Sequence, residues 1–129
     1  MKKYYKCKWE QVKDNPFVKA AMNFTKYDIQ KFNHFVWLIQ QNIPDDEKDE
    51  MEIHIARIQS ALNLLKESME SGIFDISYMH FFQGVTCHVI AEQYFVDKST
   101  IVKYNQKFIL KLSSMLYPQY YEWMQEHDR

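Results

Sequence analysis

Three lysines recur at intervals of four residues near the end of the chain, in a stretch whose apolar residues are spaced as on a helix. Lys103, Lys107 and Lys111 would therefore line one side of that helix and form a cationic strip. Such a strip can bind the phosphates of a nucleic acid, which gives salt-dependent affinity but reads no base sequence. The alternative interpretation is that these lysines are only the solvated face of an amphipathic helix.

Short polar side chains share the expected exposed face with the lysines, as a helix lying in the major groove of DNA requires. Asn105 is expected on the same face. The candidate DNA-contacting residues are Lys98, Ser99, Thr100, Val102, Lys103, Gln106, Lys107 and Lys111. Those expected to lie near base edges, at the start of the helix, are Lys98, Ser99, Val102 and Lys103.

A shorter helix is expected directly before this one, so that the pair forms a helix-turn-helix. Thr86 can cap its start, because a threonine hydroxyl accepts a hydrogen bond from a backbone N–H of the first turn. Ala91 is small where the two helices cross, and Val96 is apolar in the turn. Asp97 or Ser99 can cap the second helix. The apolar residues expected to face the core are Ile90, Ile101 and Tyr104 or Phe108.

The stretch SYMHFFQGVTCHVIAEQYFVDKSTIVKYNQKFILKLSSML resembles the helix-turn-helix of RNA-polymerase sigma-factor region 4. An aromatic-rich helix ending in glycine precedes an "IA…V.KST" core and a helix ending in alternating Leu and Lys. In so small a protein it is most similar to the ArpU and RinA-like late-gene regulators of bacteriophages of Gram-positive bacteria. The resemblance covers residues 75–116, and residues 1–45 show none. It implies a phage-encoded activator that binds double-stranded DNA upstream of late genes and acts with host RNA polymerase.

The turn departs from this pattern, because Tyr94-Phe95 stands where the motif usually has glycine. The backbone there must avoid positive φ or accept strain of about 1–3 kcal/mol. We therefore expect a turn that is longer or more open than the standard one.

The chain as a whole is expected to be all-α, a helical bundle with this C-terminal module. Its 129 residues contain only two glycines and three prolines, too few turn-forming residues for a protein of many hairpins. One compact domain is expected, made of a helical region (1–72), the helix-turn-helix region (73–117) and a tail (118–129) that docks on the core or on a partner.

The first region is expected to hold three helices: a short helix after Asn15-Pro16, a second helix starting at Thr25 with Asp28, and a long helix after Pro44 that Gly72 ends. Another helix is expected to end at Gly84.

The long helix carries an apolar seam with the alternating spacing of four and three residues that is typical of helix–helix contacts. The seam residues are Met51, Ile55, Ile58, Leu62, Leu65 and Met69. The seam fits either an intramolecular bundle or a coiled-coil dimer. A homodimer is expected on energetic grounds, because one module with few lysines binds specific DNA poorly.

Composition leaves few other functions open. The formal net charge is −1, so a nucleic-acid role depends on local charge. Residues 1–48 carry nine lysines and six acidic residues, whereas residues 49–83 carry two basic and six acidic ones.

No nucleotide-binding or hydrolase motif occurs, so we expect no enzyme and no cofactor. No two histidines are three or four residues apart, so we expect no metal site. No apolar run is long enough to span a membrane and the two cysteines form no CxxC pair, which predicts a cytoplasmic protein. The alternative function is a helical protein-interaction module, an adaptor or inhibitor that uses the seam and the aromatic tail, with the helix-turn-helix only as scaffold.

Overall fold

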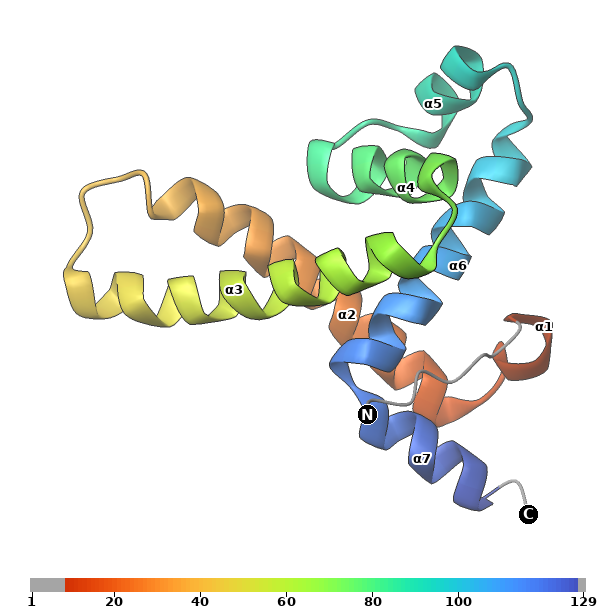
Figure 1. The fold of residues 1–129 in the computed structure, drawn as a ribbon, viewed down its shortest axis with the longest axis horizontal. Coiled ribbons are helices and arrows are strands. Elements are labelled where there is room, and N and C mark those ends of the chain that lie inside the picture. The colour runs from red at the N-terminus through yellow and green to blue at the C-terminus, as the bar shows by residue number, and fades with distance from the viewer. Residues whose placement is uncertain (1–8, 128–129) are drawn as a thin grey trace.

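The computed structural model describes residues 9–127, and every element in this range is a helix, which confirms the all-α expectation (Figure 1). The helices are α1 (Trp9–Val12), α2 (Pro16–Leu38), α3 (Asp45–Ser68), α4 (Ser71–Gln83), α5 (Cys87–Tyr94), α6 (Lys98–Leu116) and α7 (Pro118–His127). No strand occurs among these residues. None of these helices is long and apolar enough to cross a lipid bilayer.

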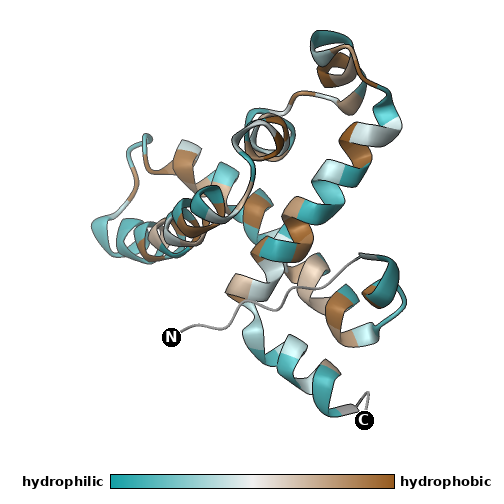
Figure 2. Cartoon of the chain, turned by 45° about the vertical axis from the view of Figure 1, so that its right-hand side comes forward, coloured by the Kyte–Doolittle hydropathy of each residue, from teal (hydrophilic) through white to brown (hydrophobic). Residues whose placement is uncertain are grey.

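Three parts meet along α6 (Figure 1). The end of α2 and the start of α3 run side by side and project as an arm. The first half of α6 extends away from that arm and carries α4 and α5. The second half of α6 packs on α2, α3 and α7. Figure 2 shows hydrophobic and hydrophilic residues alternating along the long helices, as expected where each helix buries only one side.

Helix α2 begins where the sequence predicts, but it does not stop after one short segment. Asn15 Oδ1 accepts from the backbone N–H of Phe17 at 3.0 Å, and Pro16 occupies the first helical position. The expected second start at Thr25 is wrong, because Thr25 is fully buried inside the continuous helix and its hydroxyl donates to Ala21 O at 2.8 Å. A threonine can bond either to a capped N–H or to the carbonyl four residues back, so its type alone does not mark a helix start.

Asp28, expected near that start, instead lies in a polar contact between α2, α3 and the end of α6. Tyr117 donates to its carboxylate, and Arg57 Nη1 donates to the same oxygen at 3.4 Å. Arg57 also donates through Nη2 to Leu116 O at 3.1 Å. Burial, the hydrogen bond to Asp28 and the charge of that carboxylate raise the pKa of Tyr117 to about 12. The phenol therefore stays protonated and keeps donating at physiological pH.

The junction between α3 and α4 also differs from expectation. α3 ends at Ser68, Met69 is extended with φ −118° and ψ 155°, and α4 begins at Ser71. Gly72 therefore lies in the first turn of α4 and does not end α3. The other glycine behaves as predicted, because Gly84 follows α4 with φ 70°, the left-handed conformation that glycine adopts without steric cost.

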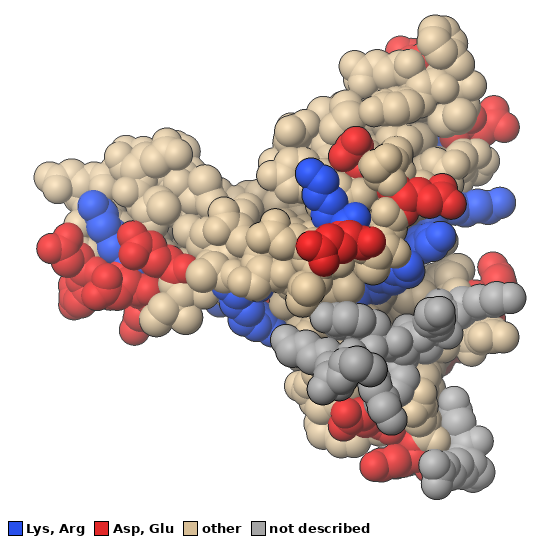
Figure 3. All heavy atoms as spheres, viewed as in Figure 1, with Lys and Arg blue, Asp and Glu red and all other residues tan. Residues whose placement is uncertain are grey.

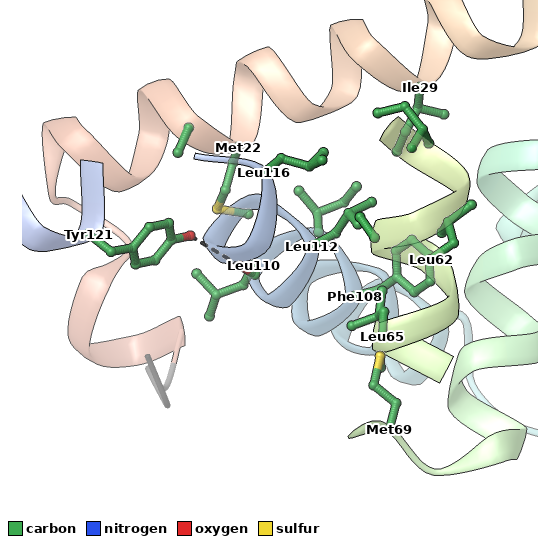
Figure 4. Packing of buried hydrophobic residues seen from close by; sticks show 14 of the residues in the cluster. Met22, Ile29, Leu62, Leu65, Met69, Phe108, Leu110, Leu112, Leu116 and Tyr121 are labelled. Carbon is green, nitrogen blue, oxygen red and sulfur yellow. Dashed lines mark hydrogen bonds between the residues drawn. The ribbon is translucent and has the colours of Figure 1, made fainter. Parts of the chain in front are cut away.

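The apolar seam of α3 is used within the chain. Five of its six residues are buried in the main core, the apolar cluster formed largely by α2, α3, α6 and α7, and Met51 is half-buried. Figure 4 shows Leu62 and Leu65 facing Phe108 and Leu112 of α6. The seam thus packs within the chain's own helical bundle. A coiled-coil dimer through the seam would require these buried side chains to be exposed.

The tail also docks on the core. Tyr121 of α7 is fully buried, and its hydroxyl donates to Leu110 O at 3.1 Å (Figure 4). Met124, one turn later, is 5% exposed. Of the two possibilities left open for the tail, contact with the core is the one observed.

Candidate nucleic-acid interface

Helices α4, α5 and α6 form a small unit with an apolar cluster of its own. Ile76, Ile90, Ala91 and Ile101 make up this cluster, which is separate from the main core. Ala91 is 7% exposed, as expected for the small residue where α5 meets α6. Thr86 caps α5 as predicted, since its hydroxyl accepts from Val89 N at 3.3 Å.

The turn between α5 and α6 accepts a positive φ. Phe95 has φ 56° and ψ 43°, and the next N–H, of Val96, donates to Ala91 O at 3.1 Å. This is the hydrogen bond of a Schellman helix end, which normally has glycine at the left-handed position. Only residues 95–97 separate the two helices, so the expectation of a longer or more open turn is wrong. Of the two possibilities expected for this turn, the backbone takes the strained one, with Phe95 at positive φ.

Replacing Phe95 by glycine is expected to stabilise the fold. The ring is 94% exposed and contributes little packing, while its Cβ makes the left-handed conformation costly. Phe95→Gly should therefore raise the free energy of unfolding by about 1 kcal/mol relative to Phe95→Ala, which removes the ring but keeps the Cβ. Urea denaturation of the two variants measures this difference. Equal stabilities would contradict a strained turn.

The start of α6 exposes most of the predicted contact residues. Lys98, Ser99, Val102, Lys103 and Lys107 are exposed. Thr100, Gln106 and Lys111 are half-buried. The apolar side faces inward as expected, because Ile101 and Phe108 are fully buried and Tyr104 is half-buried. α6 therefore presents short polar and cationic side chains along its free side, next to the turn.

Asn105 does not belong to this exposed face, contrary to expectation. It is 7% exposed and joins the three helices of the unit. Its Oδ1 accepts from Ser77 Oγ at 2.9 Å, and its Nδ2 donates to Cys87 Sγ at 3.5 Å. The sequence held a signal for this, because Asn105 lies four residues after Ile101 and three before Phe108, on the buried stripe.

Lys111 is placed differently from the other lysines of the strip. Its Nζ donates to Ser68 O at 3.3 Å, at the end of α3. A cation is favoured there by the partial negative charge of a helix C-terminus. Because of this contact within the chain, the exposed strip is shorter than predicted and contains Lys103 and Lys107.

A hollow of about 290 Å³ adjoins the exposed face of α6, and one of its lining residues is a lysine far from α6 in the sequence. Lys26 of α2 lines this hollow together with Val102 and Gln106. The remaining lining residues are Met22, His80, Phe81, Cys87, Asn105 and Ile109. Lys26 precedes α6 by more than seventy residues, so only the packing of α2 on α6 brings it to the interface.

Acidic side chains are concentrated at the tip of the arm. Figure 3 shows many acidic side chains gathered at the tip of the arm, where α3 begins, and basic side chains over α6, with further acidic side chains close to them. The acidic residues of this tip are Asp45, Asp46, Glu47, Asp49, Glu50 and Glu52. Near α6, Glu92 contacts His88 at 3.1 Å. This acidic tip lies away from α6, whereas Glu67, at the other end of α3, adjoins Ser68, the residue that Lys111 contacts.

None of the protein-family models, curated proteins or solved structures compared with this chain matches it. Within residues 9–127 no group of three or more histidine, cysteine or acidic side chains is arranged to hold a metal ion. The functional interpretation therefore depends on the geometry of α4, α5 and α6.

Proposed function

We propose that the chain is a sequence-specific DNA-binding transcription regulator that places the start of α6 in the major groove. The observation that carries this proposal is the exposed side of α6, where Lys98, Ser99, Val102 and Lys103 stand beside a three-residue turn. Polar side chains of this kind reach base edges, while lysines further along a helix contact phosphates. The short helix crossing at a buried Ala91 supports a helix-turn-helix arrangement.

The resemblance to sigma-factor region 4 extends this proposal to a biological role. We propose a bacteriophage late-gene activator that acts with host RNA polymerase. With the few lysines near α6, one copy should bind specific DNA weakly, so we also propose that two copies act together as a homodimer. Because the α3 seam is buried in its own chain, that association would use another surface.

The second candidate is a helical protein-interaction module, and the arm is the surface that favours it. Trp37 at the end of α2 is 56% exposed and Ile53 of α3 is 71% exposed. Large apolar side chains left in water on a projecting element are typical of contact sites for other proteins. The seam is covered within the chain, and the tail buries Tyr121 and Met124 there but leaves Trp123 41% exposed.

Removing both exposed lysines of the strip tests the proposal. Lys103→Ala with Lys107→Ala should lower the salt slope of duplex binding by about two units, because each phosphate contact adds about 0.9. At 0.1 M salt this corresponds to about a 60-fold loss of affinity. Lys48→Ala with Lys66→Ala, both on α3, changes net charge equally and is the matched control. Equal losses in the two double variants would show that only net charge matters and would count against the placement on α6.

A further inference from the structure

The hollow beside α6 is lined by residues of all three helices of the small unit and of α2. His80 comes from α4, Cys87 from the first position of α5, Gln106 from α6 and Lys26 from α2. Asn33 of α2 also donates to Phe81 O at 3.0 Å, which ties the end of α4 to α2 at this junction. The hollow thus lies between the proposed reading helix and a helix outside the helix-turn-helix.

The lining of this hollow carries positive charge and no carboxylate. Lys26 is its one lysine, and neither aspartate nor glutamate lines it. A larger hollow of about 650 Å³ between α3 and α4 differs, because Asp75 accompanies Lys66 there. A third, at the arm, pairs Lys31 with Glu47 and Glu50. Of these three hollows, the one beside α6 is therefore the one whose lining charge suits an anionic occupant.

The start of α5 adds to this charge. Cys87 is the first residue of an eight-residue helix, and the first N–H groups of any helix lack partners within the helix. They give that end a partial positive charge that favours phosphate. Thr86 satisfies the N–H of Val89, two residues beyond Cys87. Because Cys87 lines the hollow, the start of α5 lies beside it and adds to the positive potential of Lys26.

We propose that the sugar-phosphate backbone of one strand of duplex DNA lies across this hollow, with Lys26 contacting a phosphate. This inference rests on the proposed DNA-binding function and names a contact outside the helix-turn-helix. Successive residues of a helix are about 100° apart, so Lys107 lies well around α6 from Gln106, which lines the hollow. Lys26 and Lys107 would hold phosphates on two flanks of α6 and so fix the angle at which that helix enters the groove.

The test compares Lys26→Ala with Lys66→Ala in the full chain. Both lysines are exposed and each lines a hollow, but Lys66 belongs to the hollow that also contains Asp75. Binding of a short fluorescently labelled duplex of mixed sequence is followed by anisotropy at several salt concentrations. Lys26→Ala should lower the salt slope by about one unit and the affinity at 0.1 M salt by about eightfold. Lys66→Ala should change neither, and circular dichroism should show both variants folded.

Three outcomes would overturn the inference, and they are distinguishable. If the double variant of Lys103 and Lys107 loses affinity while Lys26→Ala does not, the DNA is bound by α6 but does not cross the hollow. If Lys26→Ala and Lys66→Ala lose affinity equally, the contribution of Lys26 is only its net charge. If the unmodified chain does not bind the duplex even at low salt, the proposed function fails and the inference fails with it.

Discussion

Leu65→Asp is expected to abolish the folded state. Leu65 is fully buried between α3 and α6, so the variant would lose the packing of a leucine and bury a carboxylate without a partner. Loss of the packing alone costs about 2–5 kcal/mol, and the buried charge adds to it. Since a typical domain is stable by only about 5–15 kcal/mol, circular dichroism should show a largely unfolded chain.

Leu64→Asp on the same helix is the matched control. Leu64 is 39% exposed, so its replacement should leave the chain folded and change stability much less. The remaining alternative is a dimer held by the α3 seam, and light scattering tests it because one chain has a mass of 15.7 kDa. If the chain is a dimer before mutation and a folded monomer after Leu65→Asp, the seam lies at a dimer interface. That result would contradict the core described above.

Ala91→Leu is expected to abolish duplex binding while the main core stays folded. Ala91 is buried in the small cluster of α4, α5 and α6, and a larger side chain there would force α5 away from α6. Overpacking of this kind costs about 1–3 kcal/mol. Because Ala91 is not part of the main core, hydrogen exchange should accelerate in α5 and the start of α6 but not in α3.

Ala56→Leu makes the same chemical change at an exposed position of α3 and should leave exchange and binding unaltered. An Ala91→Leu variant with unchanged exchange in α5 would mean that α5 does not cross α6 at this residue. Unchanged duplex binding with accelerated exchange would instead mean that the helix-turn-helix is only a scaffold.

Local signals in the sequence predicted the helix ends that depend on one or two residues. Asn15-Pro16 starts α2, Thr86 caps α5 and Gly84 follows α4 in the left-handed conformation, each through contacts within a few residues. The spacing of apolar residues likewise predicted the buried seam of α3, although it fitted two kinds of partner. Contacts within the folded chain decide between them.

The errors arise where one residue type has two uses. Thr25 resembles a cap but bonds within α2, and Gly72 resembles a helix end but lies inside α4. At the candidate interface, Asn105 is polar but bonds to Ser77 and Cys87 inside the small unit. Lys111 contacts Ser68 O, and Lys26 lies beside Val102 and Gln106 of α6 through the packing of α2 on α6. The placements of Asn105, Lys111 and Lys26 each depend on a second helix that is distant in sequence, whereas Thr25 bonds within α2 itself.

Amide NMR spectra of the labelled full chain, with and without a short duplex at low salt, test the central claim most directly. Duplex addition should shift the amides of α5, the turn and the first half of α6, with smaller shifts near Lys26 and none at the tip of the arm. The absence of any shift, or shifts confined to the arm around Trp37 and Ile53, would contradict this claim.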